Sequence, residues 1–179
     1  MKKISEGYDA FRDCARTMIK GGDVVIKGWG GFHIMCDLDS LGAIREHYNR
    51  PYKPFALMFR DIEGIRKIGK ITTEMEKILQ SPARPVVLVK KREDLDAKDQ
   101  RDMEMASPGL DSVGVYLPYS GIHHLLFRAL KEEGSEIDRL VMTSANPPGR
   151  PMALHIEDVK ELNAKGYLDH DRRISARCD

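Results

Sequence analysis

The stretch from Gly22 to Met58, GDVVIKGWGGFHIMCDLDSLGAIREHYNRPYKPFALM, decides the fold. It predicts a strand, a glycine turn, a second strand, a short helix, a loop rich in Arg, Lys and Pro, and a third strand. The first strand, VVIK, is a short apolar run, as expected of a buried strand. The glycines of GWGG allow a tight turn at little conformational cost. The helix must end near Arg50, because Pro51 disfavours helical geometry in the residue that precedes it.

Outside this stretch, helical and strand patterns alternate, which predicts one α/β domain over residues 1–179 with a sheet covered by helices. The polar segment 93–105 is predicted to be a mobile surface loop, with a lid over a site as the less favoured alternative. The last residues, HDRRISARCD, are a candidate for a final strand. Helices are predicted over 5–20, over 62–68 with Asp61 as the cap, from Thr73 through a capping box with Glu76 and with Ile78 facing inward, over 120–133 and over 156–165. Asp39 or Ser40 is expected to cap the central helix. Further strands are predicted over 86–91, 112–117 and 139–143.

The composition is that of a soluble cytoplasmic domain. The chain has 179 residues, with 41% hydrophobic and 32% charged residues, and a net charge of +1, which argues against a strongly basic nucleic-acid binder. No apolar run approaches the ~18–20 residues that a membrane span needs, and the N-terminus lacks the apolar core of a secretory signal. Cys14, Cys36 and Cys178 are widely spaced and odd in number, which indicates reduced thiols rather than a disulfide framework or a zinc site.

Four polar loops at the ends of predicted strands carry candidate ligand-binding groups. Cations and unpaired backbone N–H groups on such loops suit a phosphate or a small anion, and hydroxyl and amide groups there suit a ligand crevice. Taken singly, each loop is more simply explained as a turn or a solvated charged segment. Together they predict a ligand site if they converge in space. The candidate residues are Lys27 beside GWGG, Arg50 and Lys53 in NRPYKP, Arg84 in SPARP, and Ser144 and Asn146 in TSANPPG.

Other tempting residues have simpler interpretations. Trp29 could stack on a planar ligand, but a plain hairpin turn is the simpler explanation of its surroundings. The adjacent His123 and His124 point about 100° apart on a helix, so one is predicted to be packed and the other to lie near the surface. A hydrated turn is favoured over a cation site at 169–171, and Cys36 is assigned to the core. No metal site is assigned.

Five ordered blocks carry a resemblance to a known family. KGWGGFHIMCD, RPYKPFALM, SPARPVVLVKKR, PGLDSVGVYLPYSGIHHLL and VMTSANPPGRP occur in the order seen in YrdC-like domains. The chain is most similar to the YrdC-like domain of HypF carbamoyltransferases, which take part in [NiFe]-hydrogenase maturation. That family carries KGxGGFH where the threonylcarbamoyl-adenylate synthases carry a Pro-Thr-x-Thr-x-Tyr-Gly motif. HDRRISARCD resembles the segment leading into a carbamoyl-transfer domain, so the chain is expected to be an excised domain or a truncated relative.

The resemblance implies an open, twisted, mixed α/β sheet with one large concave face that binds ATP. It implies that the domain forms carbamoyl-adenylate from ATP and carbamate derived from carbamoyl phosphate, with release of pyrophosphate. Mg²⁺ is expected with ATP, and a HypF-type carbamoyl-transfer domain is expected as a partner in cis or in trans. The alternatives are a threonylcarbamoyl-adenylate synthase for tRNA modification and a non-catalytic module that binds nucleotide or RNA. RNA binding is the least expected of these because the net charge is near zero.

The resemblance also implies roles for individual residues. The reaction needs no protein nucleophile, only alignment and positive charge against developing negative charge. Two positions depart from the family pattern. Tyr48 stands where the family usually has a Lys, which removes one phosphate cation, and Pro148-Gly149 replace a Ser-Gly pair. The residues implied are Lys27 and Arg50 as catalytic, and Gly28, Gly30, Gly31, His33, Lys53, Arg84, Ser144 and Asn146 as substrate- or nucleotide-binding.

Overall fold

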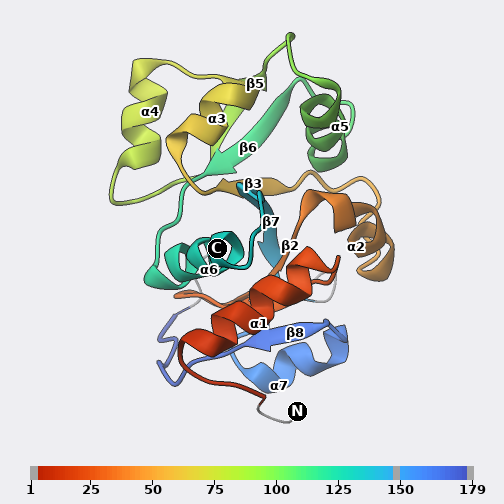
Figure 1. Cartoon of the computed structure of the whole chain (residues 1–179), viewed down its shortest axis with the longest axis vertical. Helices are drawn as coiled ribbons and strands as arrows, with labels where there is room; N and C mark the ends of the chain where they lie inside the picture. The colour runs from red at the N-terminus through yellow and green to blue at the C-terminus, as the bar shows by residue number, and fades with distance from the viewer. Residues whose placement is uncertain (1–3, 147–149, 177–179) are drawn as a thin grey trace.

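The strands form one eight-stranded sheet within residues 4–146 and 150–176, which are the residues that the computed structural model describes (Figure 1). The strand order is β4-β5-β6-β3-β7-β2-β1-β8. The strands are β1 Val24–Lys27, β2 Phe32–Cys36, β3 Ala56–Phe59, β4 Gly69–Lys70, β5 Val87–Lys91, β6 Ser112–Tyr116, β7 Arg139–Ser144 and β8 Gly166–Leu168. The helices are α1 Tyr8–Ile19, α2 Leu41–His47, α3 Ile62–Ile68, α4 Thr73–Gln80, α5 Ala97–Ala106, α6 Gly121–Glu132 and α7 Ile156–Val159, with 3-10 turns at Leu38–Ser40 and Lys160–Leu162.

The sheet is open and mixed, as the family resemblance implied. Strands β3 and β6 are parallel, and so are β1 and β8, whereas the other neighbouring pairs are antiparallel. Strand β7 lies between β3 and β2 and therefore joins the two halves of the sheet. The end of β7 carries Ser144, so this connection places the TSAN segment near the middle of the sheet.

The stretch Gly22 to Met58 folds as predicted. Strands β1 and β2 form a hairpin in which Lys27 pairs with Phe32, and the Gly28 N–H donates to the Gly31 carbonyl across 2.7 Å. Helix α2 ends at His47, before Arg50. The expectation that Asp39 or Ser40 caps α2 was wrong. Asp37 caps the preceding 3-10 turn by accepting a bond from the Leu38 N–H, while neither Asp39 nor Ser40 provides a side-chain cap to α2.

Helices cover the two faces of the sheet unequally. The α2 face carries α2, α3, α4, α5 and α7, which pack on a cluster that includes Phe32, Ile34 and Val115. The opposite face, here called the α1–α6 face, carries only α1 and α6, which pack on residues such as Ile26 and Met35. These two helices lie side by side (Figure 1), joined by ion pairs from α1 to Glu133 just beyond α6.

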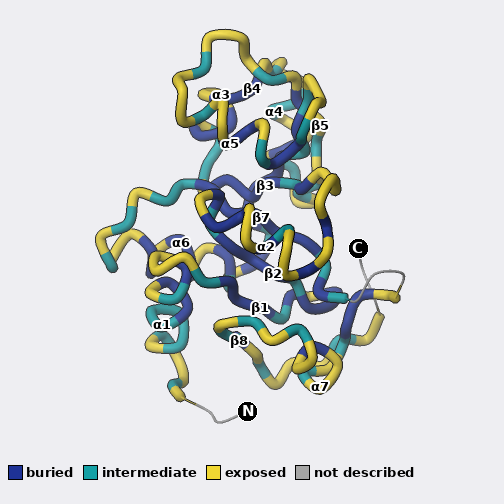
Figure 2. Tube along the Cα trace, turned by 90° about the vertical axis from the view of Figure 1, so that its right-hand side faces the viewer, coloured by how far each residue is buried: buried dark blue, intermediate teal, exposed yellow. Residues whose placement is uncertain are grey.

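Part of the α1–α6 face has no helix over it. Leu88 of β5 pairs with Gly114 of β6, and the Gly114 position lies against Val86 and Ala56. Leu88 is 69% exposed and Val86 is 55% exposed. Figure 2 shows exposed chain along β5 beside the buried central strands. We call Ala56, Val86, Leu88 and Gly114 the bare strip.

The prediction of a mobile loop over 93–105 was wrong, because α5 occupies most of it. Asp96 caps this helix by accepting a bond from the Asp99 N–H across 2.8 Å. Met103 is buried against the sheet, and the fully buried Asp102 pairs with Lys98 across 2.8 Å. Helix α5 is held by a narrow buried stripe and by ion pairs. Because most of its residues are polar, its sequence shows no helical hydrophobic pattern.

Other local expectations also needed correction. Thr72, not Thr73, caps α4, and Ile78 is 49% exposed rather than inward. The predicted helix 156–165 is an α-helical turn followed by a 3-10 turn. The last strand is β8, and residues 170–176 of HDRRISARCD form no strand. Cys14 and Cys36 are buried thiols as expected, whereas Cys178 and Pro148-Gly149 lie outside the described residues.

No helix in the described part of the chain has both the length and the apolar character needed to cross a bilayer.

Candidate functional site

Arg50 joins two of the predicted loops. Its Nη1 donates to the Thr143 hydroxyl across 2.8 Å. Its Nη2 donates to the carbonyls of Ser144 and Asn146, across 3.2 and 2.9 Å. The preceding Asn49 has a φ of 50°, a left-handed conformation that Asn tolerates better than most residues, and this turns the chain after α2. The RPYKP and TSAN segments therefore converge in space, as the sequence required of a ligand site.

Lys53 lies at the same point as Arg50. Its Nζ is 3.4 Å from the Thr143 hydroxyl that also accepts from Arg50. Burial and the charge of Arg50 lower the pKa of Lys53, and burial lowers the pKa of Arg50. Within the described residues, neither cation forms an ion pair with a carboxylate. Arg50 is buried and Lys53 is exposed. Because a buried cation is normally paired with a negative charge, Arg50 with Lys53 beside it is suited to an anionic ligand that approaches from the solvent.

His33 and Ser144 lie opposite each other on β2 and β7, so their side chains share one face of the sheet. This is the α1–α6 face, because the neighbouring pair of Ile34 and Thr143 belongs to the α2 face. The end of β7 thus presents Ser144 on one face and Thr143, with its two cations, on the other. The predicted residues surround this strand end rather than lining one surface.

His123 lies beside His33 but is a packed residue. It is 1% exposed, and its Nδ1 lies 3.0 Å from the Ser120 hydroxyl. Burial, followed by the charge of His33 and then that of His124, lowers the pKa of His123 to about 3. His124 is exposed. The expectation of one packed and one surface histidine is confirmed.

Lys27 is engaged by the segment that follows β8. Its Nζ donates to the His170 carbonyl across 2.7 Å and lies 3.2 Å from an Asp169 carboxylate oxygen. The Lys27 side chain is only 12% exposed. No contact recorded among the described residues joins Lys27 to Arg50 or Lys53. A ligand that used Lys27 would therefore compete with Asp169.

The glycine hairpin is tightly packed. The N–H of Gly28 is used within the turn, so the expectation of bare N–H groups beside Lys27 does not hold at this residue. A Cβ at Gly31 would lie 2.6 Å from Met152 Cε, which explains why only glycine fits there. Trp29, at the tip with Gly30, is 54% exposed, and its ring lies 6.0 Å from that of Tyr119.

Arg84 lies apart from the other predicted residues. It has a φ of 45°, and its Nη1 donates to the Leu79 carbonyl across 3.3 Å. It lines a small cavity of about 200 Å³ with Asp61, Pro118 and His124, and none of the other predicted site residues lines that cavity. The structure does not bring Arg84 to Arg50.

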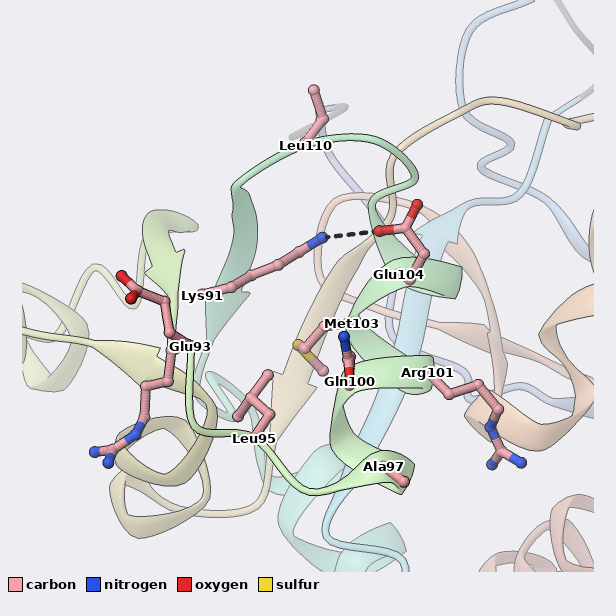
Figure 3. Close-up of a pocket in the computed structure, with 10 residues that line it drawn as sticks. Lys91, Glu93, Leu95, Ala97, Gln100, Arg101, Met103, Glu104 and Leu110 are labelled. Atoms are coloured by element: carbon pink, nitrogen blue, oxygen red, sulfur yellow. Dashed lines mark ion pairs between the residues drawn. The ribbon is translucent and has the colours of Figure 1, made fainter.

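A larger cavity of about 650 Å³ lies between the end of β5 and α5 (Figure 3). Its charged groups are already satisfied by their neighbours. Lys91 lies 3.7 Å from Glu104, as the dashed line in Figure 3 marks, and donates to the Ser107 carbonyl across 3.0 Å. Arg101 pairs with Asp39 across 2.6 Å. This balance contrasts with the Arg50–Lys53 pair, whose positive charge has no carboxylate partner among the residues that the structure describes.

Sequence reasoning missed the contacts of Arg45 and the burial of Tyr48. Arg45 of α2 donates to the carbonyls of Arg50 and Lys53, across 2.9 and 2.7 Å, and so holds the loop that carries both cations. Tyr48 is buried in the core, and its hydroxyl bonds to a carboxylate oxygen of Asp23. The position of Arg45, one helical turn before the loop, was the available signal, but a charged helical residue usually faces solvent.

The residues fit phosphate better than they fit a free metal ion. Among the described residues, no group of three His, Cys, Asp or Glu side chains could hold a metal. Mg²⁺ can be held largely by substrate phosphates and water, with few protein ligands. The arrangement is therefore compatible with Mg²⁺ only as the companion of a bound nucleotide.

Comparison with known proteins identifies relatives of the whole chain. The family model for Sua5, YciO and YrdC, described as "Telomere recombination", matches residues 16–179. The chain is 37% identical to the probable carbamoyltransferase HypF of Methanocaldococcus jannaschii over 98% of its length. It is 40% identical to the carbamoyltransferase HypF of Rhizobium leguminosarum bv. viciae over 90% of its length. In both cases it spans only 22% of the relative.

Solved structures give the same result. A full-length HypF in the phosphate- and nucleotide-bound form matches 95% of the chain with a TM-score of 0.82 and 33% identity. HypF of T. kodakarensis matches 96% with a TM-score of 0.85 and 37% identity. The chain covers 26% and 22% of these two structures. P. abyssi Sua5 complexed with L-threonine, at 18% identity and a TM-score of 0.73, shares the fold.

Proposed function

Because the chain belongs to the Sua5, YciO and YrdC family, we propose that it binds ATP at the Arg50–Lys53 pair and forms carbamoyl-adenylate. The observation that carries this proposal is the pair itself: the buried Arg50 and the exposed Lys53 meet at the Thr143 hydroxyl without a carboxylate partner among the described residues. The triphosphate of ATP would supply the missing negative charge.

The similarity to HypF, rather than to Sua5, favours carbamate as the second substrate. The HypF relatives are 33–40% identical to the chain, whereas the Sua5 structures are 18–19% identical. The sequence KGWGGFH also matches the KGxGGFH motif of the HypF resemblance. The HypF relatives are carbamoyltransferases, and one HypF structure is in the phosphate- and nucleotide-bound form. We carry both features to this chain as part of the proposal.

In the proposed reaction, an oxygen of carbamate attacks the α-phosphorus of ATP. The bond from that phosphorus to the bridging oxygen breaks, and pyrophosphate leaves with the electron pair. Arg50 and Lys53 would neutralise charge on the phosphates. Ser144 and Asn146 would contact ribose and phosphate, with Arg84 in this role only if the chain moves. Mg²⁺ bound with ATP would neutralise further phosphate charge.

The glycine hairpin would hold the carbamate and the α-phosphate. Gly28, Gly30 and Gly31 shape the turn, and His33 follows it on the face shared with Ser144. Lys27 would exchange its contact with Asp169 for the ligand anion. In a longer HypF-type protein the adenylate would pass to a carbamoyl-transfer domain, in cis or in trans, for synthesis of the hydrogenase cyanide ligand.

The test is exchange of labelled pyrophosphate into ATP. Exchange should depend on carbamate, supplied from ammonium bicarbonate, or on carbamoyl phosphate. It should fall about tenfold or more in Lys53→Gln, because a charge-assisted contact is worth about 1.5–3 kcal/mol. Lys70→Gln is a matched control, since Lys70 is exposed and pairs with Glu93.

The outcomes separate the alternatives. Exchange that requires L-threonine together with bicarbonate would favour a threonylcarbamoyl-adenylate synthase. ATP binding by the folded protein without any exchange would reduce the proposal to a nucleotide-binding module. Binding of RNA with a steep salt dependence, and no binding of ATP, would indicate an RNA-binding module instead.

A further inference from the structure

Arg45 makes an unusual set of contacts with backbone carbonyls. Its Nη1 donates to the carbonyls of Arg50, Pro51 and Lys53, across 2.9, 3.3 and 2.7 Å. Its Nη2 donates to the carbonyls of Met105 and Ala106 at the end of α5, across 2.6 and 3.4 Å. One side chain therefore ties the loop that carries Arg50 and Lys53 to a helix about 55 positions further along the chain.

The chemistry of this contact requires a guanidinium. Its planar fork offers N–H groups in two directions, and no other side chain can serve two sets of carbonyls in this way. The loop contains Pro51 and Pro54, which have no N–H, so it has few donors of its own. The last carbonyls of α5 have no partner within the helix and must bond elsewhere. Arg45 supplies donors to both.

The ring of Phe55 supports the Arg45 guanidinium. The guanidinium lies over this ring, with 4.6 Å from its central carbon to the ring centroid. Phe55 is 2% exposed, and its N–H donates to the Ala106 carbonyl across 2.8 Å. Burial lowers the pKa of Arg45, and no carboxylate pairs with it among the described residues. Its contacts are directional hydrogen bonds and a ring stack rather than ion pairs.

We infer that Arg45 is a positioning residue for the anion site: it fixes the loop 50–53 against α5 so that Arg50 and Lys53 meet at Thr143. The inference rests on the proposed function in taking ATP as the ligand of those cations. It assigns to Arg45 no contact with the ligand. Arg45 acts on ligand binding through the geometry of the loop. The planar shape of its guanidinium therefore matters more for ATP affinity than its charge.

Arg45→Lys tests this directly because it keeps the charge and loses the fork. ATP affinity, followed by the fluorescence of Trp29, the single tryptophan, should fall about tenfold. The slope of affinity against salt should stay as in the wild type, because the number of cations is unchanged. Lys53→Gln, which removes a cation, should instead make that slope shallower. Arg66→Lys is the matched control, since Arg66 is exposed and pairs with Glu63 and Glu76.

A second measurement does not depend on ATP. In Arg45→Lys, amide hydrogen exchange should quicken at Phe55 and Arg50, whose N–H groups are bonded at the ends of the loop, but not at Leu57 in the sheet. If the wild type binds no ATP, the proposed function fails while this exchange pattern still decides the role of Arg45. Equal ATP affinity and equal exchange in Arg45→Lys and wild type would overturn the inference.

Phe55→Leu covers the case in which Arg45→Lys does not fold. It keeps Arg45 and removes the ring on which the guanidinium lies. We expect it to fold and to lose ATP affinity by a few-fold, with faster exchange at Arg50. Unchanged affinity and exchange in folded Phe55→Leu would count against Arg45 as a positioning residue.

Discussion

Arg50 and Lys53 share one physical situation, which is positive charge held at Thr143 with no carboxylate partner in the described part of the chain. The Arg50 side chain is held more firmly than that of Lys53, since it donates three hydrogen bonds to the segment 143–146. Lys53 makes only one long contact, of 3.4 Å. The two cations should therefore respond differently to mutation, although both are proposed to contact the same ligand.

Arg50→Gln should damage both folding and binding, whereas Lys53→Gln should damage binding alone. Losing the buried guanidinium bonds of Arg50 should lower the free energy of unfolding by about 2–4 kcal/mol. Lys53→Gln should change it by less than about 1 kcal/mol. Urea denaturation and ATP titration, run on both variants, measure the two effects. Equal losses of stability would contradict the assignment of Arg50 as the structural member of the pair.

His123 should make the protein sensitive to acid. Its folded pKa of about 3 lies below the ordinary value of 6.5, so the folded state favours the neutral ring. This contribution to stability is complete above pH 6.5 and is lost as the pH falls towards 3, at about 1.4 kcal/mol per pH unit for one proton. The groups facing the ring are His33, Ser120 and Tyr119.

Urea denaturation between pH 5 and 6.5 should show this slope in the wild type. His123→Gln should flatten it, because an amide beside Ser120 does not titrate. His124→Gln, at the exposed neighbour, should change it far less, because the charge of His124 is the smallest of the three causes that lower the pKa of His123. Parallel curves for His123→Gln and wild type would show that another group dominates in this range.

Tyr48 stands where the family pattern has a lysine, and its surroundings explain why restoring lysine should not help. The side chain is 7% exposed, packs in the core on the α2 face and bonds to Asp23. Tyr48→Lys should therefore lower thermal stability without raising ATP affinity. Tyr48→Phe should cost about 1–3 kcal/mol, because it leaves a carboxylate oxygen of the buried Asp23 without its hydroxyl partner. Tighter ATP binding by Tyr48→Lys would show that this side chain reaches the ligand.

At the scale of elements, the sequence predicted those whose signal is local. The hairpin of β1 and β2 followed from GWGG between two apolar runs, and α3 followed from Asp61, which caps it as expected by accepting from the Gly64 N–H. Helix α5 could not be predicted in this way. From the sequence alone Asp102 is predicted to lie at the surface, whereas in the structure it is buried and pairs with Lys98 and Arg101. Edge strand β4 has two residues, too few for any pattern to show.

The hairpin and α2 contain glycines that should respond in opposite directions to alanine. Gly31→Ala should destabilise the protein by about 1–3 kcal/mol, because a Cβ there would overlap the buried Met152. Gly42→Ala should stabilise it by up to about 1 kcal/mol, because a Cβ at that helical position meets no atom within 4 Å. Thermal or urea denaturation compares the two. A neutral Gly31→Ala would mean that Met152 moves aside freely.

At the scale of the whole molecule, the site depends on contacts that no local pattern reveals. The sequence predicted which four loops carry polar groups and made a ligand site depend on their convergence, and of these the RPYKP and TSAN loops meet. It could not reveal that Arg84 faces another cavity, or that Lys27 is bound by residues more than 140 positions away. Both depend on the order of strands in the sheet. The roles of the site residues in binding ATP stay predictions.

The long-range contact of Lys27 gives a further prediction. Asp169→Asn should strengthen ATP binding by up to about fivefold, because it removes a partly exposed carboxylate that competes for Lys27. Asp171→Asn makes the same change in net charge two residues away and should have a smaller effect. Trp29 fluorescence measures both. Weaker binding by Asp169→Asn would mean that the ion pair holds Lys27 in its working position.

The two outermost strands bear on how the protein behaves when concentrated. Strand β4 has two residues and β8 has three, and β4 presents Lys70 opposite Lys90. Unpaired strand borders are where sheets of different molecules join into polymers, and short, lysine-bearing borders discourage this. The protein should therefore resist fibril growth through its sheet borders even though Leu88 leaves apolar surface in contact with water.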